Sequence, residues 1–420
     1  MKPAARAVAG AAFLTALALL CVPRVITADG EMRWRAVDQL LQGLSLEGIR
    51  YSLIGPLFAS PLIFLDHALG EGRTLASYYN VLLFLGAALA LVIMLRPFLG
   101  REVALRFGLL LGLGSMIPFH TTNFYGETFT AVGLALGSVA LLRGWEILGA
   151  IVLSLAAANT PATGVALGAM ILVLAWRERK PLWLAIPLLA AILVISESRL
   201  QRGEFFVSGY EGSRGPPTVL PFTSVTGFSY PFALGALSLL FSFGKGLCFF
   251  SPGLLAPAFA DLFVAPGEDR SRTLFWAWFA AVGGLILVYG KWWDWSGDQY
   301  WGPRFLLFAS FPASLALAGL LGQMRSLRAR IATGGALLLS AWVGFDGLVF
   351  GNHDMAICYQ LGKPYLCWYT PDFSALARPF VSPRPLGGKE LLIAAIWLFG
   401  TATLAIPLWH KSRDPVHVKK

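Results

Sequence analysis

The sequence predicts an all-α polytopic membrane protein with about twelve transmembrane helices. Of its 420 residues 56% are hydrophobic and only 13% are charged, against about 25% charged residues in an ordinary soluble domain. The apolar residues also gather in runs whose length suits helices that cross a bilayer. A soluble globule could not hide this much apolar surface, because much of its own surface must face water. The composition therefore excludes a soluble enzyme, a disordered chain and a disulfide-rich secreted module.

Short basic turns and long loops alternate along the chain. Arginine and lysine fill the short connections, such as Arg143 and Arg177–Lys180, and the positive-inside rule places these in the cytoplasm. Such loops explain the net charge of +10. The sequence contains no basic run interleaved with aromatic residues, so nucleic-acid binding is not expected. The expected spans are residues 7–27, 76–95, 103–118, 127–142, 146–158, 161–176, 181–196, 252–266, 273–290, 305–322, 331–350 and 390–409.

The first span follows Lys2 and Arg6 and is expected to stay uncleaved, because no small-x-small site precedes Asp29. With an even number of spans, the long loops 28–75, 197–250, 291–304 and 351–389 lie outside. Polar chemistry is therefore expected on one outer surface, and not in the middle of the membrane as in a typical transporter.

Two amphipathic or interfacial helices are expected in the first outer loop. Met32–Leu44 has apolar residues near helical spacing beside charged ones, which is typical of a helix on a membrane surface. Ile54–Leu65 is apolar, but it is short and contains Pro56 and Pro61, which favours an interfacial or re-entrant helix over a span.

Acidic residues follow the first span directly. Asp29 and Glu31, separated by Gly30, are placed at the membrane boundary where a carboxylate can act as a general base or a metal ligand. The same residues also suit a simple helix boundary. Both interpretations stay open on the residues alone.

A second polar segment, Pro118–Thr130, connects the outer ends of two spans. It contains His120, Tyr125 and Glu127. A glutamate at the edge of an apolar span tends to face a cavity, although it also suits the positive end of the next helix. A lone histidine such as His120 is more often a core or capping residue than a ligand.

A third segment, Ser242–Pro252, carries Lys245 between Gly244 and Gly246. Glycines allow close approach of a ligand to the backbone, and a lysine is a point charge for phosphate. The spacing is not that of a Walker A loop. The alternative is a flexible turn with a snorkelling lysine.

The densest motif is Lys291–Arg304 (KWWDWSGDQYWGPR). An interfacial aromatic belt explains its tryptophans but not its carboxylates, and carbohydrate sites combine aromatic faces with carboxylates. Arg304 is well placed to bind a phosphate through its two-pronged guanidinium. The candidate residues for the substrate cavity in this motif are Trp293, Asp294, Asp298, Tyr300 and Trp301.

Two smaller features complete the sequence-based expectations. Asn159-Thr160-Pro161 interrupts an apolar run and indicates either a tight turn or a kink. Cys358 and Cys367 share the last outer loop, where they form a disulfide or remain free thiols.

Taken together, these motifs resemble the GT-C superfamily of polytopic glycosyltransferases, in the bacterial branch related to protein mannosyltransferases and aminoarabinose transferases. The resemblance rests on Asp29 with its amphipathic helix, Tyr125-Gly126-Glu127, Gly244-Lys245-Gly246 and Trp301-Gly302-Pro303-Arg304. It implies a GT-C-like catalytic module over residues 1–322, followed by C-terminal helices over 323–420. The chain departs from the adjacent Asp-Glu pair that is commonest in the superfamily.

The resemblance also implies a reaction and a set of roles. Members take a sugar from a polyprenyl-phosphate donor and pass it to a hydroxyl of lipid, glycan or protein on the extracytoplasmic face, which for a bacterium is the periplasmic side of the inner membrane. By this resemblance Asp29 is the base, and Lys245 and Arg304 hold the donor phosphate. Some members bind a divalent metal. The residues expected to line the cavity are Glu31, His120, Tyr125, Glu127, Trp293, Asp294, Asp298, Tyr300 and Trp301, and Asp29, Glu127 and His120 are the candidate metal ligands.

Two other functions compete with this one. A flippase-like lipid or glycan transporter is expected to show internal repeats and charges within its spans, and neither is evident here. An O-antigen ligase or polymerase relies on an outer loop rich in arginine and histidine, whereas loop 351–389 holds a single histidine.

Overall fold

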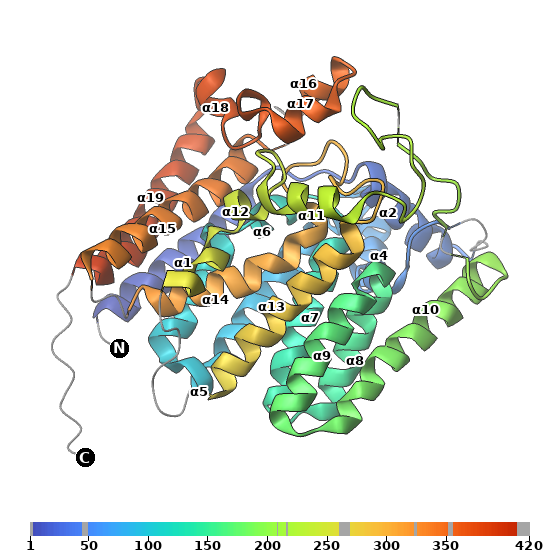
Figure 1. The fold of residues 1–420 in the computed structure, drawn as a ribbon, viewed down its shortest axis with the longest axis horizontal. Helices are drawn as coiled ribbons and strands as arrows, with labels where there is room; N and C mark the ends of the chain where they lie inside the picture. Colours follow the sequence, from blue (N-terminus) through green and yellow to red (C-terminus); the bar gives the residue numbers. More distant parts are fainter. Residues whose placement is uncertain are drawn as a thin grey trace.

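The computed structural model describes residues 3–43, 49–207, 209–215, 217–259, 269–322, 326–351 and 356–409. Over these residues the chain is a helical bundle (Figure 1). The helices are α1 (Pro3–Cys21), α2 (Ala28–Leu41), α3 (Ile54–Leu57), α4 (Ser60–Leu69), α5 (Tyr79–Leu113), α6 (Ile117–His120), α7 (Gly126–Leu142), α8 (Glu146–Asn159), α9 (Gly164–Glu178), α10 (Ile186–Arg202), α11 (Phe232–Phe241), α12 (Leu247–Phe250), α13 (Asp269–Tyr289), α14 (Ser310–Leu320), α15 (Leu327–Val349), α16 (Ala356–Gln360), α17 (Pro364–Tyr369), α18 (Arg378–Val381) and α19 (Gly388–Trp409).

Within the described residues, six helical segments are long and apolar enough to cross a membrane. They confirm a multi-pass membrane protein. Four further apolar segments, which include α7 and α8, are shorter. Since a helix rises about 1.5 Å per residue, the 14 residues of α8 fall well short of a hydrocarbon core about 30 Å thick. The expected count of twelve spans is therefore not confirmed.

Two of the expected spans differ from the structure in detail. Residues 76–95 and 103–118 fall largely within α5, which is interrupted at Gly100 by a left-handed φ of 74°. The expected span 252–266 begins as a 3-10 helix, Pro252–Phe259, and its remainder lies outside the described residues. Asn159-Thr160-Pro161 is the tight turn between α8 and α9.

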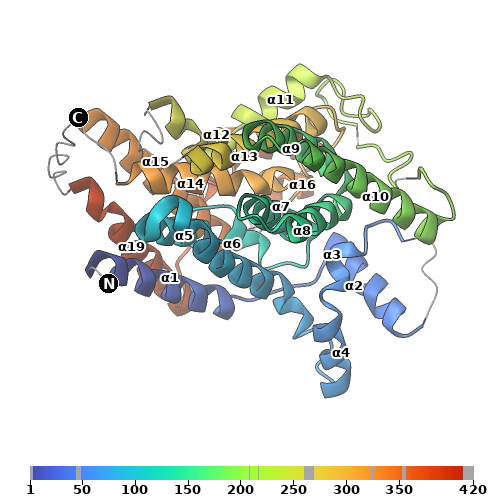
Figure 2. The same ribbon diagram turned by 90° about the horizontal axis from the view of Figure 1, so that it is seen from below.

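The short helices gather at one end of the bundle. Figure 1 shows α2, α11, α12, α16 and α17 along its upper edge, away from the turn between α9 and α10. The first amphipathic helix covers Ala28–Leu41 and so begins four residues before the expected Met32; the expected end, Leu44, lies outside the described residues. The second expected helix is divided into α3 and α4, and α4 projects from the body beside α2 (Figure 2).

The C-terminal helices are joined to the rest of the bundle by buried polar contacts. The indole of Trp397 in α19 donates to the carbonyl of Leu113 at 2.9 Å. The indole of Trp301 donates to Asp346 in α15 at 2.7 Å. Cys358 and Cys367 form a disulfide that links α16 to α17. The division of the chain near residue 322 stays a prediction.

Candidate active site

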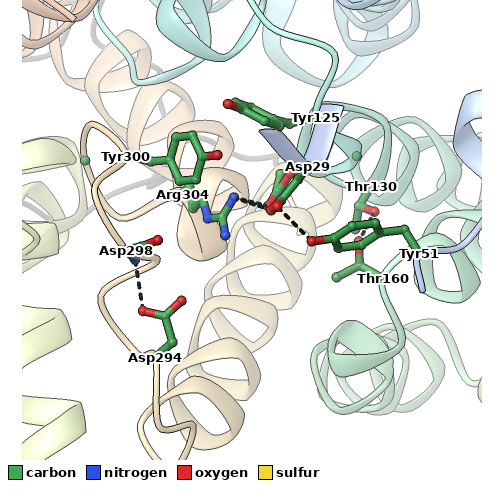
Figure 3. Close-up of polar contacts among 12 residues, drawn as sticks. Asp29, Tyr51, Tyr125, Thr130, Thr160, Asp294, Asp298, Tyr300 and Arg304 are labelled. Carbon is green, nitrogen blue, oxygen red and sulfur yellow. Dashed lines mark hydrogen bonds and ion pairs between the residues drawn. The ribbon is translucent and has the colours of Figure 1, made fainter. Parts of the chain in front are cut away.

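Asp29 and Arg304 form an ion pair at the end of the bundle where α2 lies, although they are 275 positions apart in sequence. The Arg304 guanidinium lies 2.9 Å from one carboxylate oxygen of Asp29, and the Tyr51 hydroxyl donates to the other at 2.7 Å. Figure 3 shows Asp29 between these two partners. The Arg304 side chain is only 8% exposed, whereas that of Asp29 is 27% exposed, so the carboxylate is the more accessible member of the pair.

Local structure explains how Asp29 reaches this position. It lies in the first turn of α2, where a carboxylate is favoured by the helix dipole. Burial alone would raise the pKa of Asp29, but the charge of Arg304, the Tyr51 hydroxyl and the charge of Arg33 together hold it below its usual value. Asp29 is therefore a carboxylate at neutral pH.

Glu127 is the second carboxylate near Arg304, at 3.8 Å. It lies in the first turn of α7. A cavity adjoins both residues. Its polar end includes Glu127, Thr130, Thr160 and Arg304, and its walls continue into the bundle through Leu134, Leu285, Leu307 and Phe308. The cavity is thus lined by the buried Arg304 and Glu127 on one side and by apolar side chains of the bundle on the other.

Tyr125 and Tyr300 pack edge to face beside the pair, with ring centroids 5.0 Å apart. The guanidinium of Arg304 lies over the Tyr300 ring, 4.3 Å from its centroid, a cation–π contact that fixes its orientation. The structure therefore brings together five of the predicted residues: Asp29, Tyr125, Glu127, Tyr300 and Arg304.

His120 is buried close by, and neither ring nitrogen meets a hydrogen-bond partner among the described residues. Burial and the nearby charges of Arg304 and Lys245 lower the pKa of His120 to about 3. The imidazole is accordingly neutral at physiological pH.

Lys245 is placed differently from Arg304. It is fully buried, and its ammonium donates to the backbone carbonyls of Asp298, Tyr300 and Gly302. An ammonium has three donors, and all three are used in these contacts.

Asp294 and Asp298 shape the loop that precedes Arg304. The Asp294 carboxylate accepts from the amide of Asp298 at 2.9 Å (Figure 3). It also accepts from the hydroxyl of Ser296 at 3.2 Å. Burial raises the pKa of Asp294 to about 6. Asp298 itself is exposed. Both aspartates thus belong to the loop scaffold next to the ion pair.

Three predicted cavity residues contact other groups. Trp301 is fully buried and bonded to Asp346. Glu31 binds Arg35 at 2.6 Å and Arg73 at 3.2 Å. Trp293 packs beside Gly215, and its amide donates to the Gly227 carbonyl. These contacts are within the scaffold and the surface, and none is to the Asp29–Arg304 pair.

Sequence reasoning missed Tyr51 and its neighbours. The guanidinium of Arg33 lies 4.8 Å from the Tyr51 ring centroid, and that of Arg50 lies 4.4 Å from the ring of Tyr210. Tyr51 and Tyr210 pack edge to face at 6.1 Å. The run Arg50-Tyr51 after the first amphipathic helix was the available signal, but neither residue lies in a pattern that separates it from an ordinary interfacial pair.

The candidate metal ligands do not form a metal site. Arg304 lies within ion-pair distance of both Asp29 and Glu127, and the same nitrogen atom faces the two carboxylates. No group of three or more His, Cys, Asp or Glu side chains with metal-site geometry occurs among the described residues. Because Arg304 already faces both carboxylates and no third ligand joins them within the described residues, the residues present do not fit a divalent metal.

No family model matches the chain, and no curated protein matches it. Among solved structures, the crystal structure of ArnT from Cupriavidus metallidurans bound to undecaprenyl phosphate matches with a TM-score of 0.52. The match covers 96% of this chain and 76% of ArnT at 15% sequence identity. The chain shares the fold of ArnT. The GT-C-like fold predicted from the motifs is thereby confirmed, and at this identity the likeness to ArnT concerns the fold.

Proposed function

We propose that the protein is a membrane glycosyltransferase that moves a sugar from a polyprenyl-phosphate donor to a hydroxyl acceptor. The observation that carries the proposal is the Asp29–Arg304 pair, whose arginine lines a cavity with largely apolar walls. The shared fold adds support, because ArnT was crystallised with undecaprenyl phosphate. The acceptor is a lipid, a glycan or a protein on the extracytoplasmic face of the bacterial inner membrane.

The cavity suits the two parts of such a donor. Arg304 offers a guanidinium to the phosphate, with the Nε atom buried and unpartnered among the described residues. The isoprenoid chain is proposed to follow the apolar wall formed by Leu134, Leu285 and Phe308. Burial of that chain supplies binding energy that is independent of the sugar.

Asp29 is the proposed general base. It removes the proton from the acceptor hydroxyl, whose oxygen then attacks the anomeric carbon of the sugar. The bond from that carbon to the phosphate oxygen breaks, and its electron pair leaves with the polyprenyl phosphate. Arg304 neutralises the charge that develops on this leaving group. Tyr51 orients the carboxylate through its hydrogen bond.

Donor binding is proposed to activate the base. In the free protein Arg304 lies against Asp29 and depresses its pKa. A phosphate that draws the guanidinium toward itself weakens this contact, so Asp29 becomes a stronger base only when a donor is present. The pair thus links occupancy of the donor site to readiness for proton transfer.

A binding comparison tests the proposal without knowledge of the sugar. The full chain in lipid nanodiscs is titrated with undecaprenyl phosphate and, as the matched control, with undecaprenol, which lacks the phosphate. We expect undecaprenyl phosphate to raise the thermal unfolding temperature and undecaprenol to have a much smaller effect. Equal effects of both lipids, or none, would contradict the proposed donor class.

A second assay separates transfer from transport. Proteoliposomes loaded with labelled polyprenyl-phosphate sugars are mixed with candidate hydroxyl acceptors. We expect label to appear on an acceptor. Movement of the intact donor between leaflets without transfer would identify a flippase instead.

A further inference from the structure

Lys245 contacts the loop that leads into Arg304 at three points within five residues. Its Nζ lies 3.0 Å from the carbonyl of Asp298 and 3.2 Å from that of Gly302, and it also contacts the carbonyl of Tyr300. Hydrogen bonds from a charged donor are about twice as strong as neutral ones. To bind a phosphate oxygen, this ammonium would have to give up one of them.

The loop needs such a contact because its backbone is unusual. Gly297 and Gly302 have φ values of 69° and 67°, and Asp298, which is not a glycine, has a φ of 60°. This left-handed region is costly for most side chains. The conformation also directs three carbonyl oxygens toward one point, where they repel one another unless a cation lies between them.

The same loop sets the position of the Arg304 side chain. A Cβ atom placed on Gly297 would lie 2.9 Å from Cγ of Arg304, so the backbone packs directly against this side chain. Tyr300 supplies the ring on which the guanidinium lies. A change in the path of residues 297–302 therefore moves the surface that holds Arg304 against Asp29.

Lys245 is itself fixed by its neighbour Gly244. The Gly244 amide donates to the carbonyl of Trp368 at 3.1 Å, and a Cβ at this position would collide with the carbonyl of Cys367. Cys367 belongs to the disulfide with Cys358. The lysine is thus anchored to a cross-linked segment, which gives it a rigid base.

We propose that Lys245 is a positioning residue: it holds residues 297–302 in the conformation that presents Tyr300 and Arg304 to Asp29. Its effect on catalysis rests on the proposed function, whereas its effect on the loop does not. This role replaces the direct phosphate contact that the sequence motif alone suggests.

The test compares three variants of the full chain in nanodiscs. Lys245→Met removes the donors at similar length, Lys245→Arg retains a cation with several donors, and Lys291→Met is the matched control at an exposed lysine in the same motif. Hydrogen exchange is measured for the amides of residues 297–302 and 304, several of which are hydrogen-bonded within the loop. Affinity for undecaprenyl phosphate is measured in parallel.

We expect Lys245→Met to speed exchange of these amides at least about tenfold, the equivalent of losing one charged hydrogen bond, while exchange in α5 and α13 is unchanged. Undecaprenyl phosphate should bind at least about tenfold more weakly to the same variant. Lys245→Arg should restore much of both properties, and Lys291→Met should change neither. If Lys245→Met proves too unstable to measure, the graded response of Lys245→Arg relative to the wild type and Lys291→Met decides the question.

The outcomes separate the two proposals. Weaker lipid binding with unchanged loop exchange in Lys245→Met would overturn the positioning role and restore a direct phosphate contact. Faster loop exchange in a protein whose wild-type form does not bind undecaprenyl phosphate would sustain the positioning role and reject the proposed function. Unchanged exchange and unchanged binding in both Lys245 variants would overturn the positioning role.

Discussion

Two buried cations, Arg304 and Lys245, have partners of different kinds. Arg304 faces the carboxylates of Asp29 and Glu127 beside a cavity, whereas Lys245 is enclosed by carbonyl oxygens of its own chain. Burying either charge is costly unless it is paired. The difference shows that burial and charge alone do not identify a ligand site. A cation serves a ligand when its present partners can be exchanged and space adjoins it.

The largest effect is expected for Asp29→Asn, which removes the proposed general base, the ion-pair partner of Arg304. General base catalysis typically contributes about 10²- to 10⁴-fold, so sugar transfer should fall by that factor. Transfer of labelled sugar in nanodiscs measures the loss, and unchanged thermal unfolding shows that the variant is folded. Turnover close to that of the wild type would remove Asp29 from this role.

Arg304→Gln should produce the next largest effect. We expect affinity for undecaprenyl phosphate to fall about ten- to a hundredfold, because a charged hydrogen bond to the phosphate is lost. The Michaelis constant for the acceptor should change much less. Lys291→Met is the control. If Arg304→Gln changed only the dependence on acceptor, the assignment of the phosphate to Arg304 would be wrong.

The pH dependence of the reaction tests whether donor binding releases Asp29 from Arg304. In the free protein the pKa of Asp29 lies below its usual value, so activity is retained as pH falls until the carboxylate takes up a proton at that low pKa. The acid limb of kcat/KM reports the free protein, and that of kcat reports the donor complex. We expect the limb of kcat at the higher pH. Coincident limbs would show that donor binding does not weaken the pair.

Trp301→Phe should have the smallest effect on activity, because Trp301, like Lys245, is fully buried and bonded within the protein. The substitution removes the hydrogen bond to buried Asp346, and loss of such a partner typically costs about 1–3 kcal/mol in the free energy of unfolding. The thermal unfolding temperature should therefore fall, while the affinity for the donor stays near the wild-type value. A large loss of donor affinity in a stable variant would place Trp301 in the binding site.

The sequence was sufficient for the class of fold. Long apolar runs report membrane helices directly because the bilayer imposes their length. The count was less predictable, since α7 and α8 are too short to be separated by hydropathy from buried helices.

The site was only partly predictable, for a reason that Arg304 and Lys245 illustrate. Both lie in glycine-containing motifs, and both have the residue type that a phosphate needs. Their roles differ because tertiary contacts saturate one and leave the other beside a cavity. Trp301 and Glu31 were grouped with the cavity by sequence proximity, but their side chains contact Asp346 and two arginines. Side-chain direction of this kind is set by packing and not by spacing.

The most direct test is a density map of the chain in nanodiscs with undecaprenyl phosphate bound. We predict phosphate density within hydrogen-bond distance of the Arg304 guanidinium, an isoprenoid chain along Leu134 and Phe308, and Lys245 still bound to the carbonyls of 298–302. Phosphate density away from Arg304, with the Asp29–Arg304 pair intact, would contradict the proposed site.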